Sequence, residues 1–278
     1  MKTLIPLSLL FTVFVFSCTN EGTVDSGQNS NSEDPDTSTV LDSIVDEIIQ
    51  IPVDSNRRKI DVSALFDKAT ENFELPLKID STFLEKYAIT GDDAEYNLTY
   101  QEAQHLGFSF PDGNLSNSQK WQIQTFVNMD SLKQSNKLED YLSSLDIGQA
   151  RYATANMFGK VKVSDQTTIL LWSSDYATYE ACPYGEGVYI FGTVFTNQTA
   201  TQTSLLGQES GGGDAPVWGD EYLESEITDS TISIYRLETW GEEDYETGEE
   251  IIEKREMHEV LGLSAYGLMV LEKDDYDY

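Results

Sequence analysis

The sequence predicts an α+β protein in which a mainly helical region, residues 40–158, precedes a β-rich domain, residues 159–278. Up to about residue 148, apolar residues recur at the three- and four-residue spacing of amphipathic helices. From about residue 159, short runs rich in β-branched and aromatic residues alternate with turn residues. No helical segment of crossover length separates these runs, so parallel pairing is disfavoured. We therefore expect an antiparallel β-meander, folded as one curved sheet or as a small sandwich.

The first seventeen residues have the pattern of a secretion signal. Lys2 supplies a positive charge, and the apolar run from Leu4 to Phe16 is shorter than the roughly 20 residues that span a bilayer. The run ends in Val15-Phe16-Ser17-Cys18, which resembles a bacterial lipobox. The resemblance implies that cleavage precedes Cys18 and that its thiol carries a diacylglycerol. The signal peptide is thus residues 1–17, and the mature chain is tethered to a membrane by lipid.

Residues 18–39 are predicted to form a disordered tether. Val24 is the only aliphatic residue between positions 19 and 39, so this stretch cannot bury apolar surface. The helical region then opens with residues 40–50, where four aliphatic side chains share one helical face before Pro52.

Two further helices are expected from their boundaries. Ser81 is placed to cap a helix over residues 82–87, and Thr99 to Glu102 fits a capping box with Gly107 as the stop. A third helix is expected to end near Gly148, because apolar residues share one face from position 138 to 145. The segment from Trp121 to Val127 fits a strand and a helix equally well.

The predicted strands all lie in the second half of the chain. Asp229-Ser230 and the glycine run Gly211 to Gly213 are among the turn residues that separate them, and we expect the glycine run to form a hairpin tip. The predicted strands are Lys160–Val163, Thr167–Ser173, Gly187–Thr196, Gln202–Gly207, Tyr222–Thr228, Thr231–Thr239, Ile251–Val260 and Tyr266–Leu271.

The charge balance limits the partners of this protein. Acidic residues number 49 and basic residues 17, which gives a formal charge of -32 and disfavours nucleic acid. Cationic partners and Ca²⁺ stay open, because six carboxylates crowd between Glu242 and Glu250. The acidic spacing of an EF-hand loop is absent there, which favours a solvated hairpin. With Cys18 lipidated, Cys182 has no partner for an intramolecular disulfide.

Motifs for catalysis are weak throughout. His105 and His258 belong to no recognised spacing, so we expect no catalytic residue, bound metal or cofactor. The clearest indication of a binding surface is aromatic. Trp218 and Trp240 flank predicted turns, where exposed indole rings can stack on a ligand. The alternative is that both rings pack against the core or a turn.

Together, the signal, lipobox, acidic tether and lysine-poor β-domain are similar to lipoproteins of the Bacteroidota. Leu145-Asp146-Ile147-Gly148 and the stretch Ser174 to Tyr184 are also similar to such lipoproteins. The resemblance implies a position in the cell envelope, at the outer membrane, and names no activity. It also implies O-glycosylation where aspartate, serine or threonine, and a small aliphatic residue or threonine follow one another.

Four serines fit this glycosylation pattern. Ser43 and Ser230 are the accessible candidates, whereas Ser81 and Ser131 are expected to cap helices. The alternative is that all four serve only caps and turns.

These observations lead to two functional hypotheses. The first is a membrane-tethered, non-catalytic binding or structural module of the cell envelope. The second is a carboxylate-dependent hydrolase that acts on an extracellular glycan. Two carboxylates that converge in a cleft about 5–10 Å apart would favour the hydrolase.

Overall fold

A computed structural model describes residues 60–92, 94–108, 115–180, 184–244, 247–264 and 267–277. The signal peptide, the tether and the helix expected at 40–50 lie outside the described residues, and so do Cys18, Ser43 and Cys182. Residues Arg58–Tyr278 form one compact unit. None of the helices within the described ranges is long and apolar enough to span a membrane.

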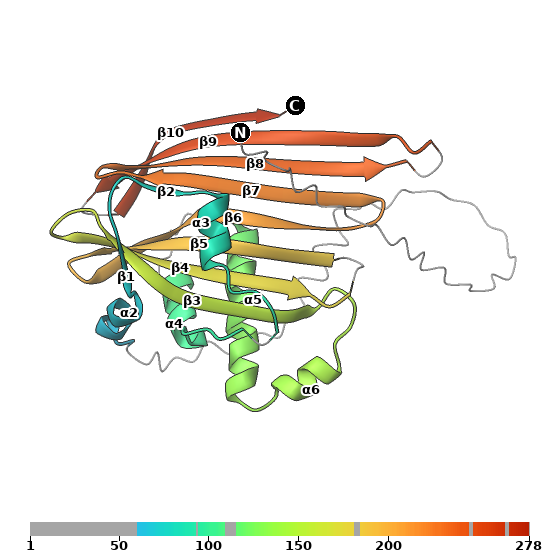
Figure 1. Ribbon diagram of the computed structural model, residues 1–278, viewed down its shortest axis with the longest axis horizontal. Helices are drawn as coiled ribbons and strands as arrows, with labels where there is room; N and C mark the ends of the chain where they lie inside the picture. Colours follow the sequence, from blue (N-terminus) through green and yellow to red (C-terminus); the bar gives the residue numbers. More distant parts are fainter. Residues whose placement is uncertain are drawn as a thin grey trace, which may run out of the picture. The chain divides into compact units, whose positions relative to one another are not determined.

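The described part of the chain is mostly one curved, open sheet with a few helices (Figure 1). The helices are α2 (Val62–Lys68), α3 (Ser81–Tyr87), α4 (Tyr100–Phe108), α5 (Asn117–Gln134) and α6 (Leu138–Ser143). Two short strands, β1 (Glu71–Phe73) and β2 (Leu77–Ile79), lie between α2 and α3. The long strands are β3 (Ala150–Lys162), β4 (Thr167–Thr178), β5 (Tyr184–Thr196), β6 (Thr199–Asp214), β7 (Val217–Ile227), β8 (Thr231–Glu243), β9 (Glu250–Ser264) and β10 (Gly267–Asp277).

Strands β3 to β10 are hydrogen-bonded in chain order, each antiparallel to the next. This confirms the antiparallel meander and selects the curved sheet over the sandwich. Two pairings lie outside the meander. Strand β1 pairs parallel with β3, with Glu71 opposite Gly159, and β2 pairs with β7, with Leu77 opposite Ile227. Strand β2 takes the place of β6 along the end of β7, since the β6–β7 pairing reaches no further than Leu223.

Local capping signals account for the helices. The capping box expected at Thr99 is present, because the Thr99 amide donates to Glu102 Oε2 at 2.7 Å and Thr99 Oγ1 accepts from the Glu102 amide at 3.4 Å. A second box joins Ser116 to Gln119 at the start of α5. Residues 121–127 are therefore helical. Along α5 the buried side chains include Ile123, Phe126 and Val127, at helical spacing.

Four local expectations are corrected. Asp80 caps α3 in place of Ser81, since its Oδ1 accepts from the Phe83 amide at 3.2 Å. Ser131 lies inside α5, not at its cap. Strand β3 starts at Ala150, before the expected Lys160, because pairing with β4 outweighs the low strand propensity of its alanines. Gly211 to Gly213 lie in the paired part of β6, and the turn falls at 215–216 instead.

Two hydrophobic cores pack on opposite faces of the central strands. Consecutive residues of β4 alternate between them: Leu170 and Trp172 belong to one core, and Ile169 and Leu171 belong to the other. Helices α2, α4 and α5 contribute to the first core, which therefore includes the helical part of the chain. Helix α3 and strand β2 contribute to the second, which continues to β9 through Leu261, and Figure 1 shows α3 lying across β5 and β6.

Candidate functional site

A cavity of about 320 Å³ lies where α5, α6, the start of β3 and the segment after α3 meet. This volume is at the lower end of the range typical of small-ligand sites, about 300–1,000 Å³. The described lining residues combine aliphatic side chains, tyrosines and three charged groups. They are Gly91, Asp92, Ala94, Tyr96, Met129, Lys133, Leu138, Leu142, Leu145, Arg151, Tyr152, Ala153, Thr154 and Tyr179.

The segment between α3 and α4 forms one wall and is fixed to the sheet at both ends. Near its start, the Ile89 amide donates to Asp175 Oδ2 at 2.9 Å, and Thr154 Oγ1 donates to the Ile89 carbonyl at 3.0 Å. Near its end, Asn97 exchanges two 2.8 Å hydrogen bonds with the backbone of Met157, one to its carbonyl and one from its amide. Satisfied backbone groups hold this wall in place without a ligand.

Asp130 of α5 positions the tyrosine on this wall. Its buried carboxylate accepts from the hydroxyl of Tyr96 at 2.9 Å, from the amide of Tyr100 at 2.8 Å and from Gln134 Nε2 at 2.8 Å. Burial, followed by the nearby Asp130 charge, raises the pKa of Tyr96 well above its usual value. The Tyr96 hydroxyl therefore stays protonated and remains a donor to Asp130.

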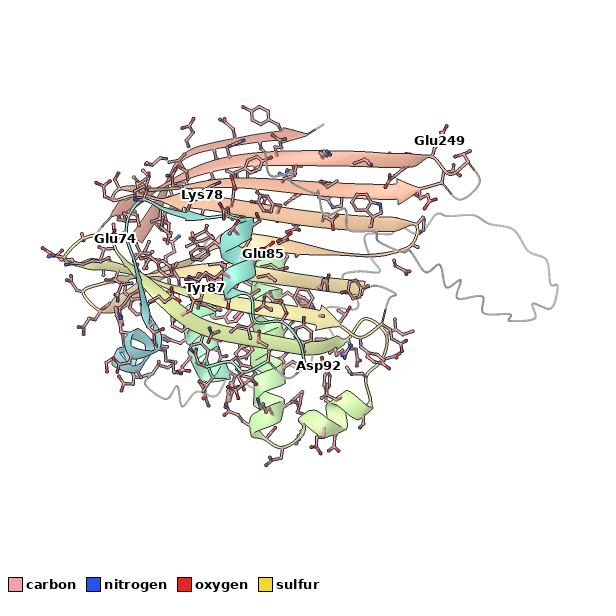
Figure 2. The ribbon with its side chains drawn as sticks, viewed as in Figure 1. Glu74, Lys78, Glu85, Tyr87, Asp92 and Glu249 are labelled. Atoms are coloured by element: carbon pink, nitrogen blue, oxygen red, sulfur yellow. The ribbon has the colours of Figure 1, made fainter. Side chains whose placement is uncertain are left out.

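The described lining residues include two cations and one carboxylate. Arg151 pairs with Asp92, and both side chains are about half exposed. Lys133 Nζ lies 4.5 Å from the centroid of the Tyr96 ring, a cation–π distance. Figure 2 places Asp92 beside β3, far from Glu249 at the β8–β9 end of the sheet.

Asp175 lies behind the cavity wall. It is fully buried, its Oδ2 also accepts from Thr154 Oγ1 at 3.3 Å, and its Oδ1 has no hydrogen-bond partner within the described residues. Burial raises the pKa of Asp175 to about 7, and the hydrogen bonds from Ile89 and Thr154 oppose that rise. Thr154 separates this carboxyl from the cavity, because it touches Asp175 and lines the cavity itself.

This arrangement is suited to holding a ligand. Among the described lining residues, Asp92 is the only carboxylate, and Arg151 already pairs with it. A glycoside hydrolase needs two carboxyl groups that face one substrate, and Asp175 does not reach the lining. The cavity thus offers cations, apolar side chains and tyrosines for binding and orientation.

The two tryptophans expected to form a binding surface lie on opposite faces of the sheet. Trp218 lies opposite Gly241 in the register of β7 and β8, and Trp240 lies opposite Gly219. A Cβ at Gly241 would collide with the indole of Trp218, and one at Gly219 would lie 3.3 Å from Cδ1 of Trp240. Each ring covers a glycine of the neighbouring strand, so the two do not form one platform.

The remaining candidates lie away from the cavity. Ser230 is exposed in the turn between β7 and β8, and His258 lies on β9 with its ring 4.9 Å from that of Tyr235. No group of three or more histidine, cysteine, aspartate or glutamate side chains that could hold a metal occurs among the described residues. Glu246, one of the six crowded carboxylates, lies outside them.

Sequence reasoning missed Lys133, Arg151, Asp92 and Asp175. The chain has only 17 basic residues, so a cation beside an apolar helix face is a signal for a binding site. The signal for Asp175 was stronger, because this aspartate follows closely on the apolar run from Ile169 to Trp172. In the structure every position of that run is buried. A carboxyl there must be hydrogen-bonded or protonated.

Comparison with known proteins adds no relative. No protein-family model matches the chain, and no curated protein and no solved structure matches it.

Proposed function

We propose that this protein is a lipid-anchored binding module of the cell envelope and that the cavity between α5, α6 and β3 is its binding site. The cavity carries the proposal, because its wall is held in shape by hydrogen bonds from Ile89 and Asn97 and it needs no ligand to form. Preformed, mostly apolar cavities with a few polar groups are the usual sites for small ligands.

The anchoring part of the proposal rests on the sequence. A secretion signal that ends in the lipobox at Cys18 supports lipidation and, with the resemblance to lipoproteins of the Bacteroidota, an outer-membrane position. Ser43, beside the tether, is the first candidate for O-glycosylation. Exposure of Ser230 in its turn supports it as the second candidate.

The anchor is tested by Cys18→Ala in the native host. The variant should leave the membrane fraction and lose the mass of the lipid, because a single lipidated cysteine holds the chain. The matched control is Cys182→Ala, which should stay in the membrane fraction. Unchanged partition of Cys18→Ala would reject the anchor.

The binding site is tested with the neutral apolar fluorophore N-phenylnaphthylamine and the full mature chain. Ala94→Phe fills the cavity from its wall, and we expect its affinity for the fluorophore to fall by about tenfold, or about 1.4 kcal/mol. Glu95→Phe is the control, since Glu95 is the exposed neighbour and does not line the cavity. Equal affinity in both variants would place the bound fluorophore elsewhere and overturn the proposed site.

A further inference from the structure

The cavity is locally cationic in a strongly acidic protein. Its described lining carries Lys133, Arg151 and Asp92, a formal charge of +1, whereas the whole chain carries -32. At physiological ionic strength, charges more than about 8 Å away are largely screened. A ligand in the cavity therefore responds mainly to the lining residues and to groups in contact with them, such as Asp130, and only weakly to the distant acidic surface.

The two cations differ in how far they are neutralised. Arg151 has Asp92 as its counter-ion. For Lys133, no carboxylate of the described residues lies within the 4.0 Å of an ion pair. Its charge is thus available to a ligand.

The contacts of Asp130 explain why it forms no ion pair with Lys133. It precedes Lys133 by three residues on α5, the spacing of a helical ion pair. Its carboxylate oxygens already accept from Tyr96, Tyr100 and Gln134. The Lys133 ammonium group instead lies over the Tyr96 ring, which holds the cation in place. No described residue accepts a hydrogen bond from it, so its donors can bind an anion.

Much of the remaining described lining is apolar. Met129, Leu138, Leu142 and Leu145 come from α5, α6 and the segment after α6, and Leu142 is 39% exposed. An ion without an apolar part would leave these side chains uncovered. Lys133 is exposed at the edge of the cavity, so an uncharged apolar ligand would leave its ammonium group in water and forgo its attraction.

We propose that the cavity binds a small organic monoanion with an apolar body, such as a carboxylate or sulfonate. Its anionic group contacts Lys133, and its apolar body packs on Leu138, Leu142 and Leu145. This inference rests on the proposed function, because it names the ligand class of the same site.

Two fluorophores that differ by one sulfonate group test the ligand class. They are anilinonaphthalene sulfonate and the neutral N-phenylnaphthylamine, each titrated against the full mature chain. The sulfonate should bind more tightly. Lys133→Met should weaken sulfonate binding about fivefold to tenfold, in line with a contact to one charged group, and should leave the neutral compound unchanged.

Lys137→Met is the matched control. Lys137 lies between α5 and α6, is exposed and does not line the cavity, so its loss changes net charge equally and should leave both affinities unchanged. Equal binding of both compounds, unaffected by Lys133→Met but lost in Ala94→Phe, would overturn the ligand class and keep the binding site. Binding of both that survives Ala94→Phe, or no binding of either, would overturn the site and the ligand class together.

Discussion

Strands β4 and β5 and strands β9 and β10 belong to one sheet, yet only the first pair is covered on both faces. Leu171 on β4 is fully buried, whereas Leu271 on β10 is 55% exposed. Helices α5 and α3 pack on β4 and β5. Most side chains of β9 are exposed or half-buried, and Leu261 is its one fully buried residue. A sheet encloses a cavity only where a second layer faces it, and the candidate site lies on the covered side of the molecule.

Different interactions hold the two regions together. The covered strands rely on apolar burial from two sides. Strands β8 to β10, the bare region, rely more on contacts between neighbouring side chains of the sheet. Arg236 on β8 bonds to Glu221 at 2.9 Å and to Glu238 at 2.8 Å, and Arg255 links Glu238 to Asp275 on β10.

A matched pair of leucines gives the largest expected difference between the regions. Leu171→Ala should lower the free energy of unfolding by about 4 kcal/mol, within the range of roughly 2–5 for a leucine removed from a close-packed core. Leu271→Ala should lower it by less than about 1 kcal/mol, because that side chain is already in contact with water. Urea unfolding of both variants is the measurement. Equal losses would mean that β10 is covered in solution.

The sequence predicted the features that depend on neighbouring residues. The capping box at Thr99 needs only four consecutive residues, and the antiparallel order follows from short connections. The start of β3 could not be found in this way, since Ala150 to Ala155 gain their extended form from pairing with β4. The pairing of β2 with β7 likewise joins segments that are far apart in the chain.

The candidate site could not be predicted from the sequence either, because it too depends on contacts between distant residues. Tyr96 meets Asp130, and Asp92 meets Arg151, across long separations in sequence that only the folded chain brings together. The tryptophans illustrate the converse. Their positions beside turns were visible, but whether Trp218 and Trp240 face a ligand or a glycine depends on the register between β7 and β8.

The buried carboxyl of Asp175 predicts that stability depends on pH. Its pKa is about 7 in the fold and 3.8 without the fold, so between these values the folded state binds more protons and stability falls as pH rises. The difference of about 3 pH units corresponds to about 4 kcal/mol at 1.36 kcal/mol per unit, of which we expect about 3 to be measured.

Asp175→Asn should remove this dependence. The amide keeps an oxygen for the Ile89 amide and carries no charge, so the variant should gain about 3 kcal/mol at pH 8 relative to the native protein and little at pH 4. Urea unfolding across this pH range is the measurement. The control is Asp165→Asn, an exposed site. An Asp175→Asn profile parallel to that of the native protein would contradict the assignment.

The ion pairs of β8 are the corresponding test for the bare region. Arg236→Met leaves Glu221 and Glu238 facing each other with less compensation, and the side chain of Glu238 is only 10% exposed. We expect a loss of about 2 kcal/mol, below the roughly 3–5 of a fully buried pair. Amide exchange should accelerate in β8 to β10 before it does so in β4 and β5. Lys254→Met, an exposed change on β9, should stay within about 0.5 kcal/mol.

The smallest expected effect distinguishes the two interpretations of the tryptophans. If Trp240 covers Gly219 for the sake of the sheet, Trp240→Ala should lower stability by about 1 kcal/mol and leave fluorophore binding unchanged, because this ring does not line the cavity. Gly219→Ala would push against the same ring, so the two changes should be non-additive in a double-mutant cycle. Val217→Ala, at an exposed position of the neighbouring strand β7, is the control for loss of surface area. Unchanged stability together with weaker ligand binding would instead make Trp240 part of a binding surface, and the bare region would then carry a function of its own.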